Sequence, residues 1–242
     1  MGVDGGSADP KGRAELATEK NTYSSKKKKR RQKKPTSTPS AVQRLFETCK
    51  EVFAHGGRGF IPSADDVERL RSVLDTLKLT DVGVSPNLPF FHYVVMDGPP
   101  PVTYLHLYAC SNFSIGIFCL PQAAVIPLHN HPGMTVVSKL LFGSMHIKSY
   151  DWVNDPEGSN EKIKSSNVTS CAVLDVLGPP YNDGEGRACS YYKEYVFSSF
   201  PGKAIGVSGE SKEYAWLEER ESKPDDLVVR GAEYRGPKIV GR

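Results

Sequence analysis

Apolar residues recur with a helical period in two stretches of the first third of the chain. Within 41–54 they lie three and four residues apart, and Gly56-Gly57 follows, which predicts a helix that ends there. A second apolar stripe begins after Ser63, a good N-cap residue with Asp66 three positions on. Because each stripe covers one face only, we expect two helices that bury that face against the rest of a domain.

The hydrophobic period changes to two after the proline-rich link 86–101. Short runs rich in Val, Ile, Tyr and Phe are separated by turn residues, and no helical stretch lies between them, which indicates an antiparallel barrel or sandwich. A hairpin turn is expected at Gly143-Ser144 and a short helix at 216–221. The expected strands cover 102–108, 113–120, 123–128, 135–142, 145–152, 171–177 and 190–197, with a weaker one around Val228.

Composition divides the chain into a tail and a domain. Residues 1–40 are rich in Gly, Ser, Lys and Pro and predict a disordered basic tail, 41–236 a folded domain, and 237–242 a frayed end. Six Lys and two Arg fall within 26–34, a run that is typical of a nuclear-import signal or of a solvated tail. No aromatic residue interrupts that run, so we expect no direct nucleic-acid binding and a location in nucleus and cytoplasm.

Charge, hydropathy and cysteine use exclude several classes of protein. Of 31 Lys and Arg residues, 23 remain outside the basic run, against 28 Asp and Glu, so the body is mildly acidic. No apolar run has the length of a membrane span and the first thirty residues are polar, so we expect a soluble intracellular protein without a membrane segment. The five widely spaced cysteines form no CxxC pair, which argues against a disulfide framework and against a cysteine-based zinc site.

His129 and His131 are the strongest candidates for chemistry. Side chains at i and i+2 of an extended chain project to the same face, so both imidazoles could bind one metal ion, the alternative being two surface or hydrogen-bonded histidines. An apolar run precedes the pair, Pro132-Gly133 follows it, and the spacing to Gly143 matches the first motif of cupins, which are small jelly-roll barrels. The expected fold is therefore a mostly β cupin barrel with two N-terminal helices.

One position departs from the ordinary cupin motif. Counting back from Gly143 places Val136 where cupins carry a glutamate ligand, and valine binds no metal. A site held by neutral imidazoles alone leaves a ferrous ion with its full charge and with open positions, which favours a thiolate ligand next to dioxygen.

Four long runs of the chain resemble those of the plant cysteine oxidases, relatives of animal cysteamine dioxygenase. The runs are FSIGIFCLP, IPLHNHPGMTVVSKLLFGSMHIKSYDW, CAVLDVLGPPY and YAWLEERE, in that order. The resemblance implies a monomeric cysteine dioxygenase that uses Fe²⁺ and O₂. It also implies the substrate, the N-terminal cysteine of target proteins such as group VII ethylene-response transcription factors. Oxidation of that cysteine to the sulfinic acid begins N-degron degradation in oxygen and hypoxia sensing.

The resemblance also assigns roles to individual residues. His129 and His131 match the first two iron ligands, Asp175 an acidic residue near the substrate, and Tyr181 a tyrosine of an active-site loop. Without the resemblance, Asp175 and Tyr181 are better interpreted as a surface acid and a packing aromatic residue.

The third iron ligand of the family has no counterpart here. It belongs to a Gly-Gly-Asn-Ile-His type motif that precedes the CAVLD run, yet the eighteen residues between Trp152 and Cys171 contain no histidine. The resemblance therefore implies that a segment of several tens of residues is missing. Of the other histidines, His106 is placed best to face a barrel interior, although the family uses no ligand at that position. The remaining three are His55, His92 and His146.

Two functions from different classes follow from this gap. One is an active thiol dioxygenase, and the other is a catalytically impaired isoform that acts only as a binding or regulatory cupin protein. A metal-dependent isomerase of the cupin class is a third option, which Val136 disfavours.

Overall fold

A computed structural model describes residues 38–57, 59–92, 98–151, 169–196 and 215–241. The expected disorder of the basic tail and its import signal lie outside these residues, apart from 38–40. Within the described ranges, none of the helices combines the length and the apolar character that crossing a membrane requires.

Both predicted helices are confirmed, together with their caps. Helix α1 spans Ala41–Val52, and the Ser40 side chain accepts a hydrogen bond from the backbone N–H of Gln43 at 3.1 Å. Helix α2 spans Ala64–Thr76, and the Ser63 hydroxyl oxygen accepts from the N–H of Asp66, also at 3.1 Å. Each cap satisfies an N–H group that the first helical turn leaves without a partner.

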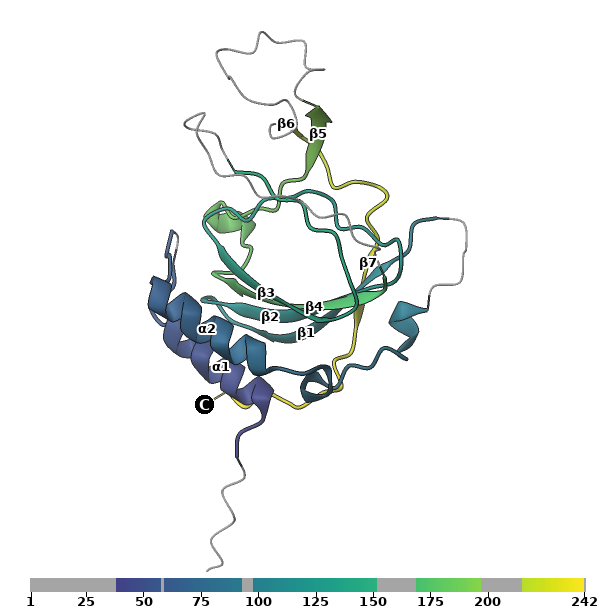
Figure 1. The fold of residues 1–242 in the computed structure, drawn as a ribbon. Coiled ribbons are helices and arrows are strands. Elements are labelled where there is room, and N and C mark those ends of the chain that lie inside the picture. Colours follow the sequence, from purple (N-terminus) through teal and green to yellow (C-terminus); the bar gives the residue numbers. More distant parts are fainter. Residues whose placement is uncertain (1–37, 58, 93–97, 152–168, 197–214, 242) are drawn as a thin grey trace, which may run out of the picture. The chain divides into compact units, whose positions relative to one another are not determined.

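The strands form a five-stranded sheet in the order β3-β4-β2-β1-β7 and a separate pair, β5-β6 (Figure 1). Neighbours in the large sheet are antiparallel except that β7 runs parallel to β1, so the expected all-antiparallel arrangement is wrong at this edge. The strands are β1 Val102–Ala109, β2 Ser114–Leu120, β3 Thr135–Phe142, β4 Cys171–Gly178, β5 Tyr192–Val196, β6 Ala215–Glu219 and β7 Val229–Ala232. Short 3₁₀ helices cover Leu79–Val82, Pro89–Phe91 and Asp183–Glu185.

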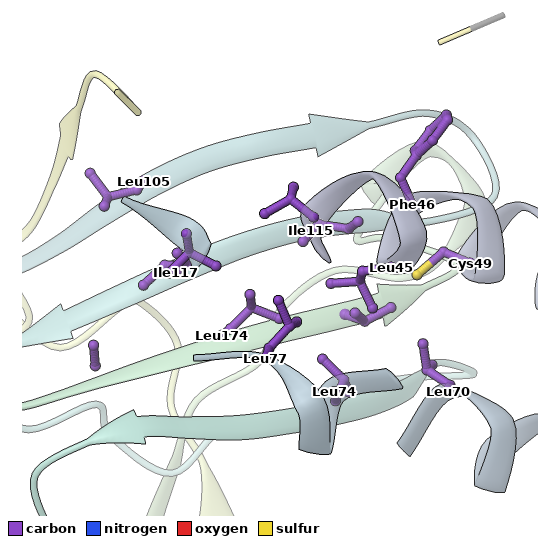
Figure 2. Packing of buried hydrophobic residues seen from close by; sticks show 14 of the residues in the cluster. Leu45, Phe46, Cys49, Leu70, Leu74, Leu77, Leu105, Ile115, Ile117 and Leu174 are labelled. Atoms are coloured by element: carbon purple, nitrogen blue, oxygen red, sulfur yellow. The ribbon is translucent and has the colours of Figure 1, made fainter. Parts of the chain in front are cut away.

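The two helices cover one face of the large sheet, where the hydrophobic core lies (Figures 1 and 2). Because side chains alternate along a strand, every second residue of β2 and β4 points into this core, as Ile115, Ile117 and Leu174 do. The helices contribute the opposing residues Leu45, Phe46, Cys49, Leu70 and Leu74. The other face of the same strands is left for different side chains, among them Asp175.

Three predicted elements are wrong. The run 123–128 is not a strand, because Ala123 adopts a positive φ of 64° and only the Leu128 end reaches a partner. The described part of 145–152 is likewise no strand, because the chain leaves the ladder at Gly143, and the N–H of Ser144 donates to the hydroxyl oxygen of Thr169 at 3.0 Å. Most of the expected helix 216–221 is instead part of β6, which pairs with β5 and ends at Glu219.

The fold is a mixed α/β arrangement of two helices followed by strands. Within the described residues the large sheet is open: β3 pairs with β4 on one side, and β3 and β7 form its two edges. No closure into a barrel is seen in these parts of the chain.

Candidate functional site

A short antiparallel ladder holds the two candidate histidines in place. His129 forms an isolated bridge with Tyr191, the N–H of Tyr192 donates to Leu128 O at 2.9 Å, and the N–H of Asn130 donates to Ser190 O at 3.1 Å. The segment that carries the histidines is therefore paired with the segment that leads into β5.

Asn130, between the two histidines, stabilises this ladder through hydrogen bonds of both its side chain and its backbone. Its Oδ1 accepts from the N–H of Ser190 at 2.8 Å, and its carbonyl oxygen accepts from the Tyr181 hydroxyl at 2.8 Å. A tight turn follows, in which the N–H of Met134 donates to His131 O at 3.2 Å and Gly133 takes a φ of 61°. The positions of both imidazoles thus depend on groups from three separate segments.

The imidazoles of His129 and His131 lie side by side in forms suited to a metal. Their ring centroids are 4.8 Å apart at an interplanar angle of 62°. Nδ1 of His129 lies 2.8 Å from the carbonyl oxygen of Pro127, and because a carbonyl only accepts, Nδ1 is the donor, which leaves Nε2 as the ring nitrogen available to a metal. Burial, assisted by the neighbouring His129, lowers the pKa of His131, so that its ring is neutral at physiological pH.

Asp175 lies on β4, on the sheet face opposite the helices, and is electrostatically linked to His129. Burial raises the pKa of its carboxyl group, while a hydrogen bond from Ser138 and the nearby His129 lower it by less. Its Oδ1 atom is buried and has no hydrogen-bond partner. A buried carboxylate oxygen without a partner is unfavourable, so this atom is the natural contact for a donor brought by a ligand.

Tyr181 connects the loop after β4 to the histidines. Its ring centroid is 5.9 Å from that of His131, and burial raises the pKa of its hydroxyl, which remains neutral. The buried Arg187 braces this loop: its Nε donates to Pro180 O at 2.9 Å and its Nη1 contacts Glu185 Oε2 at 2.7 Å.

Sequence reasoning identified the histidines, Asp175 and Tyr181, and the structure brings them together through the contacts above. The sequence analysis did not select Asn130, Ser138 or Arg187. Asn130 had a local signal, since it separates the two histidines, whereas Ser138 and Arg187 acquire their partners only through strand pairing and loop packing.

The described residues supply two of the donors that an iron site would need. They contain no cluster of three His, Cys, Asp or Glu side chains placed to hold a metal. The other histidines in these ranges are all exposed, and none forms such a cluster with His129 and His131: His55, His92, His106 and His146. The two adjacent imidazoles fit a divalent metal, but as an incomplete donor set.

Comparison with known proteins gives consistent matches. Plant cysteine oxidase 2 of Arabidopsis thaliana is 52% identical over 228 residues, covering 82% of this chain and 83% of the relative. Plant cysteine oxidase 1 of the same species is 48% identical over 241 residues, covering 85% and 82%. The 2-aminoethanethiol dioxygenase of Mus musculus is 27% identical over 253 residues, covering 83% of this chain and 97% of the relative.

These matches also contain a gap. Since 82% of 242 residues is about 198, about 30 of the 228 positions aligned with plant cysteine oxidase 2 have no residue in this chain. The PCO_ADO family model matches in two parts, 73–170 and 162–239, which meet where the third-ligand motif is expected. The chain belongs to the PCO_ADO family of thiol dioxygenases, the enzyme family of the plant cysteine oxidases.

Proposed function

We propose that this chain is an iron-dependent dioxygenase that converts the N-terminal cysteine of target proteins to cysteine sulfinic acid with O₂. The carrying observation is the pair of adjacent imidazoles of His129 and His131, with His129 electrostatically linked to the buried carboxyl group of Asp175, within a chain of this family. Both atoms of O₂ end on the cysteine sulfur, so the reaction needs no added reductant.

His129 and His131 are the residues that would hold Fe²⁺, His129 through Nε2, because its Nδ1 donates to Pro127 O. Bound iron supplies the positive charge that favours a thiolate and a binding position for O₂. The residues of the chain do the rest. Asp175 orients the substrate ammonium or a proton-carrying water with its unpartnered Oδ1, and Tyr181 fixes the histidine segment and borders the entrance.

The finer fold assignment is part of this proposal. We infer a cupin barrel whose inner surface is the sheet face that carries Asp175, with the histidine segment lying opposite. The electrostatic links of Asp175 to His129 and to Tyr181 support this, since both lie outside the large sheet. The missing family segment falls between β3 and β4, next to the open edge of β3.

Mass spectrometry of a peptide that begins Cys-Gly-Gly tests the activity. After incubation with protein, Fe²⁺ and air, the peptide should gain two oxygen atoms at its first residue. The same peptide with an acetylated N-terminus should gain far less, because the ammonium that Asp175 recognises is gone. A free-amine peptide that stays unoxidised would refute activity for this chain.

A catalytically impaired isoform is the second candidate, and the incomplete donor set favours it. The iron content per chain after anaerobic loading, measured with and without His129→Ala, distinguishes this candidate from an active enzyme. An active enzyme should bind iron and lose it on substitution, whereas an impaired isoform should bind little iron in either form.

Partners and location complete the proposal. Group VII ethylene-response transcription factors are the substrates that the family suggests, and the basic run 26–34 would direct the monomeric protein to the nucleus as well as the cytoplasm. A fluorescent fusion in which the run is replaced by Ser and Gly should lose its nuclear signal. An unchanged nuclear fraction would rule out the import role.

A further inference from the structure

One row of residues crosses four strands on the sheet face that carries Asp175. Strand pairing sets His106 of β1 opposite Gly116 of β2, Gly116 opposite Asp175 of β4, and Asp175 opposite Ser138 of β3. Because Gly116 has no side chain, the row has an open position immediately beside Asp175.

Tyr104 fills that position. A Cβ atom placed on Gly116 would lie 2.4 Å from Cε2, 2.5 Å from the hydroxyl oxygen and 2.6 Å from Cζ of Tyr104. Tyr104 is in register with Phe118, with ring centroids 5.0 Å apart, so its side chain leans along the sheet into the row of Asp175. Since Cβ positions of directly opposed residues are about 4.5–5.5 Å apart, the phenol group lies beside the Asp175 carboxyl group.

One carboxylate oxygen of Asp175 lacks a hydrogen-bond donor, and a phenol hydroxyl group can provide one. Ser138 forms a hydrogen bond with the carboxylate, but Oδ1 is buried and has no partner. Burial and the negative charge of Asp175 raise the pKa of Tyr104, so the phenol keeps the proton that it would donate. Tyr104 therefore offers a neutral donor next to an acceptor that lacks one.

We propose that Tyr104 is a positioning residue that donates a hydrogen bond to Oδ1 of Asp175, directly or through one water. Gly116 leaves room for the Tyr104 ring because glycine has no side chain. Tyr104 holds the carboxylate in the orientation that receives the substrate ammonium. The inference rests on the proposed role of Asp175 and adds the residue that fixes it.

Tyr108 provides a matched control on the same strand. The register between β1 and β2 shifts between His106 and Tyr108, which turns Tyr108 towards the helices. Its ring packs 4.7 Å from that of Phe46 and 5.3 Å from that of Phe113, measured between centroids. Tyr108→Phe thus removes a phenol hydroxyl from β1 without touching the Asp175 face.

Binding measured by calorimetry under argon tests the proposal without any turnover. The full chain is titrated with the Cys-Gly-Gly peptide and with its N-acetylated form, and the ratio of the two affinities reports ammonium recognition. Tyr104→Phe should lower this ratio about tenfold, the effect of one hydrogen bond to a charged group, and leave the affinity for the acetylated peptide nearly unchanged. Gly116→Ala should lower the ratio too, because the added methyl group displaces the Tyr104 ring, whereas Tyr108→Phe should not change it.

Any of the following results would overturn the inference. An unchanged ratio in Tyr104→Phe would show that the hydroxyl positions nothing, and equal losses for both peptides would show a merely structural role. If the unaltered chain shows no preference for the free amine, or if Asp175→Asn keeps the full preference, the role of Asp175 fails and the role of Tyr104 fails with it. The oxidation assay with the Cys-Gly-Gly peptide is independent of these titrations, so failure of the enzymatic function is recognised separately.

Discussion

Asp175 is a residue whose proposed function works against the stability of the fold. A carboxyl group with a raised pKa favours the protonated form in the folded protein, so the folded state binds more protons than the unfolded state over the window between the two pKa values. Stability therefore falls as the pH rises above the ordinary value of 3.8 and through the raised pKa. At neutral pH the ionised, desolvated carboxyl group is therefore a standing destabilisation, which the proposed hydrogen bond from Tyr104 would reduce without removing and which a functional site tolerates.

Asp175→Asn should consequently stabilise the metal-free protein at pH 7 by about 1–2 kcal/mol, the usual size of the effect of a buried unsatisfied polar group. The gain should shrink as the pH falls towards 4, where the aspartate becomes protonated in the folded state. Urea unfolding between pH 4 and pH 8 measures it, with the exposed Asp226→Asn as the control that should show no such trend. A loss of stability at pH 7 would contradict this prediction, because it would mean that the folded protein favours the ionised carboxylate over a neutral amide.

At the scale of elements, strand and loop junctions hold the candidate site together. The histidine segment is not part of the large sheet, and its position depends on the ladder to 190–192 and on the Asn130 side chain. Loss of those contacts should therefore affect both stability and the arrangement of the two imidazoles.

Asn130→Ala removes the acceptor of the Ser190 N–H and should lower the free energy of unfolding by about 1–3 kcal/mol, since a partly buried donor then lacks a partner. Asn130→Asp keeps an acceptor oxygen and should lose clearly less. Chemical denaturation of both variants measures the difference, and equal losses would show that the hydrogen bond to Ser190 does not matter.

Gly143 marks the point where the chain leaves β3, and no other residue fits there. Its φ is 81°, and an added Cβ would lie 2.1 Å from Ser170 O and 2.8 Å from the Cβ of Cys171. Gly143→Ala should therefore cost about 2–5 kcal/mol, because backbone strain and overpacking add. Gly59 has a similar φ of 77° but nothing within 4 Å of its Cβ position, so Gly59→Ala should cost only about 1 kcal/mol. Similar losses in thermal unfolding for both variants would contradict the steric argument.

At the scale of the whole molecule, the gap between β3 and β4 affects both metal binding and the sheet. The described part of the chain offers two imidazoles and no third ligand, and β3 is an edge strand in it. An open edge exposes backbone groups that another chain can pair with, and a weak metal site adds little stability.

A variant with the corresponding segment of plant cysteine oxidase 2 inserted between Trp152 and Cys171 should be more stable and less prone to aggregate. Saturating Fe²⁺ should raise the melting temperature of the restored protein by about 5–10 °C but that of the present chain by less than about 2 °C. Paired anaerobic melting curves measure both shifts. Equal shifts would show that another side chain completes the metal site, and the impaired-isoform alternative would then be withdrawn.

Local signals in the sequence were sufficient for the helices and for much of the sheet. Ser40 and Ser63 cap helices from within one turn, and the alternation in β1 to β4 reflects one face packed on the helices. The histidine pair was visible because both residues lie in one short segment, and long shared runs were sufficient to identify the family.

Tertiary structure decided whatever depends on partners far away in the sequence. The run 216–221 has residues that suit a helix or a strand, and pairing with β5 makes most of it part of β6. The run 123–128 has strand residues, but only its Leu128 end meets a neighbouring strand. The unpartnered oxygen of Asp175 and the opposite faces of Tyr104 and Tyr108 follow from register and from a bulge. Periodicity reports one chain segment at a time, whereas a hydrogen-bond partner or a shared sheet face is set by two segments together, and only the folded chain contains that information.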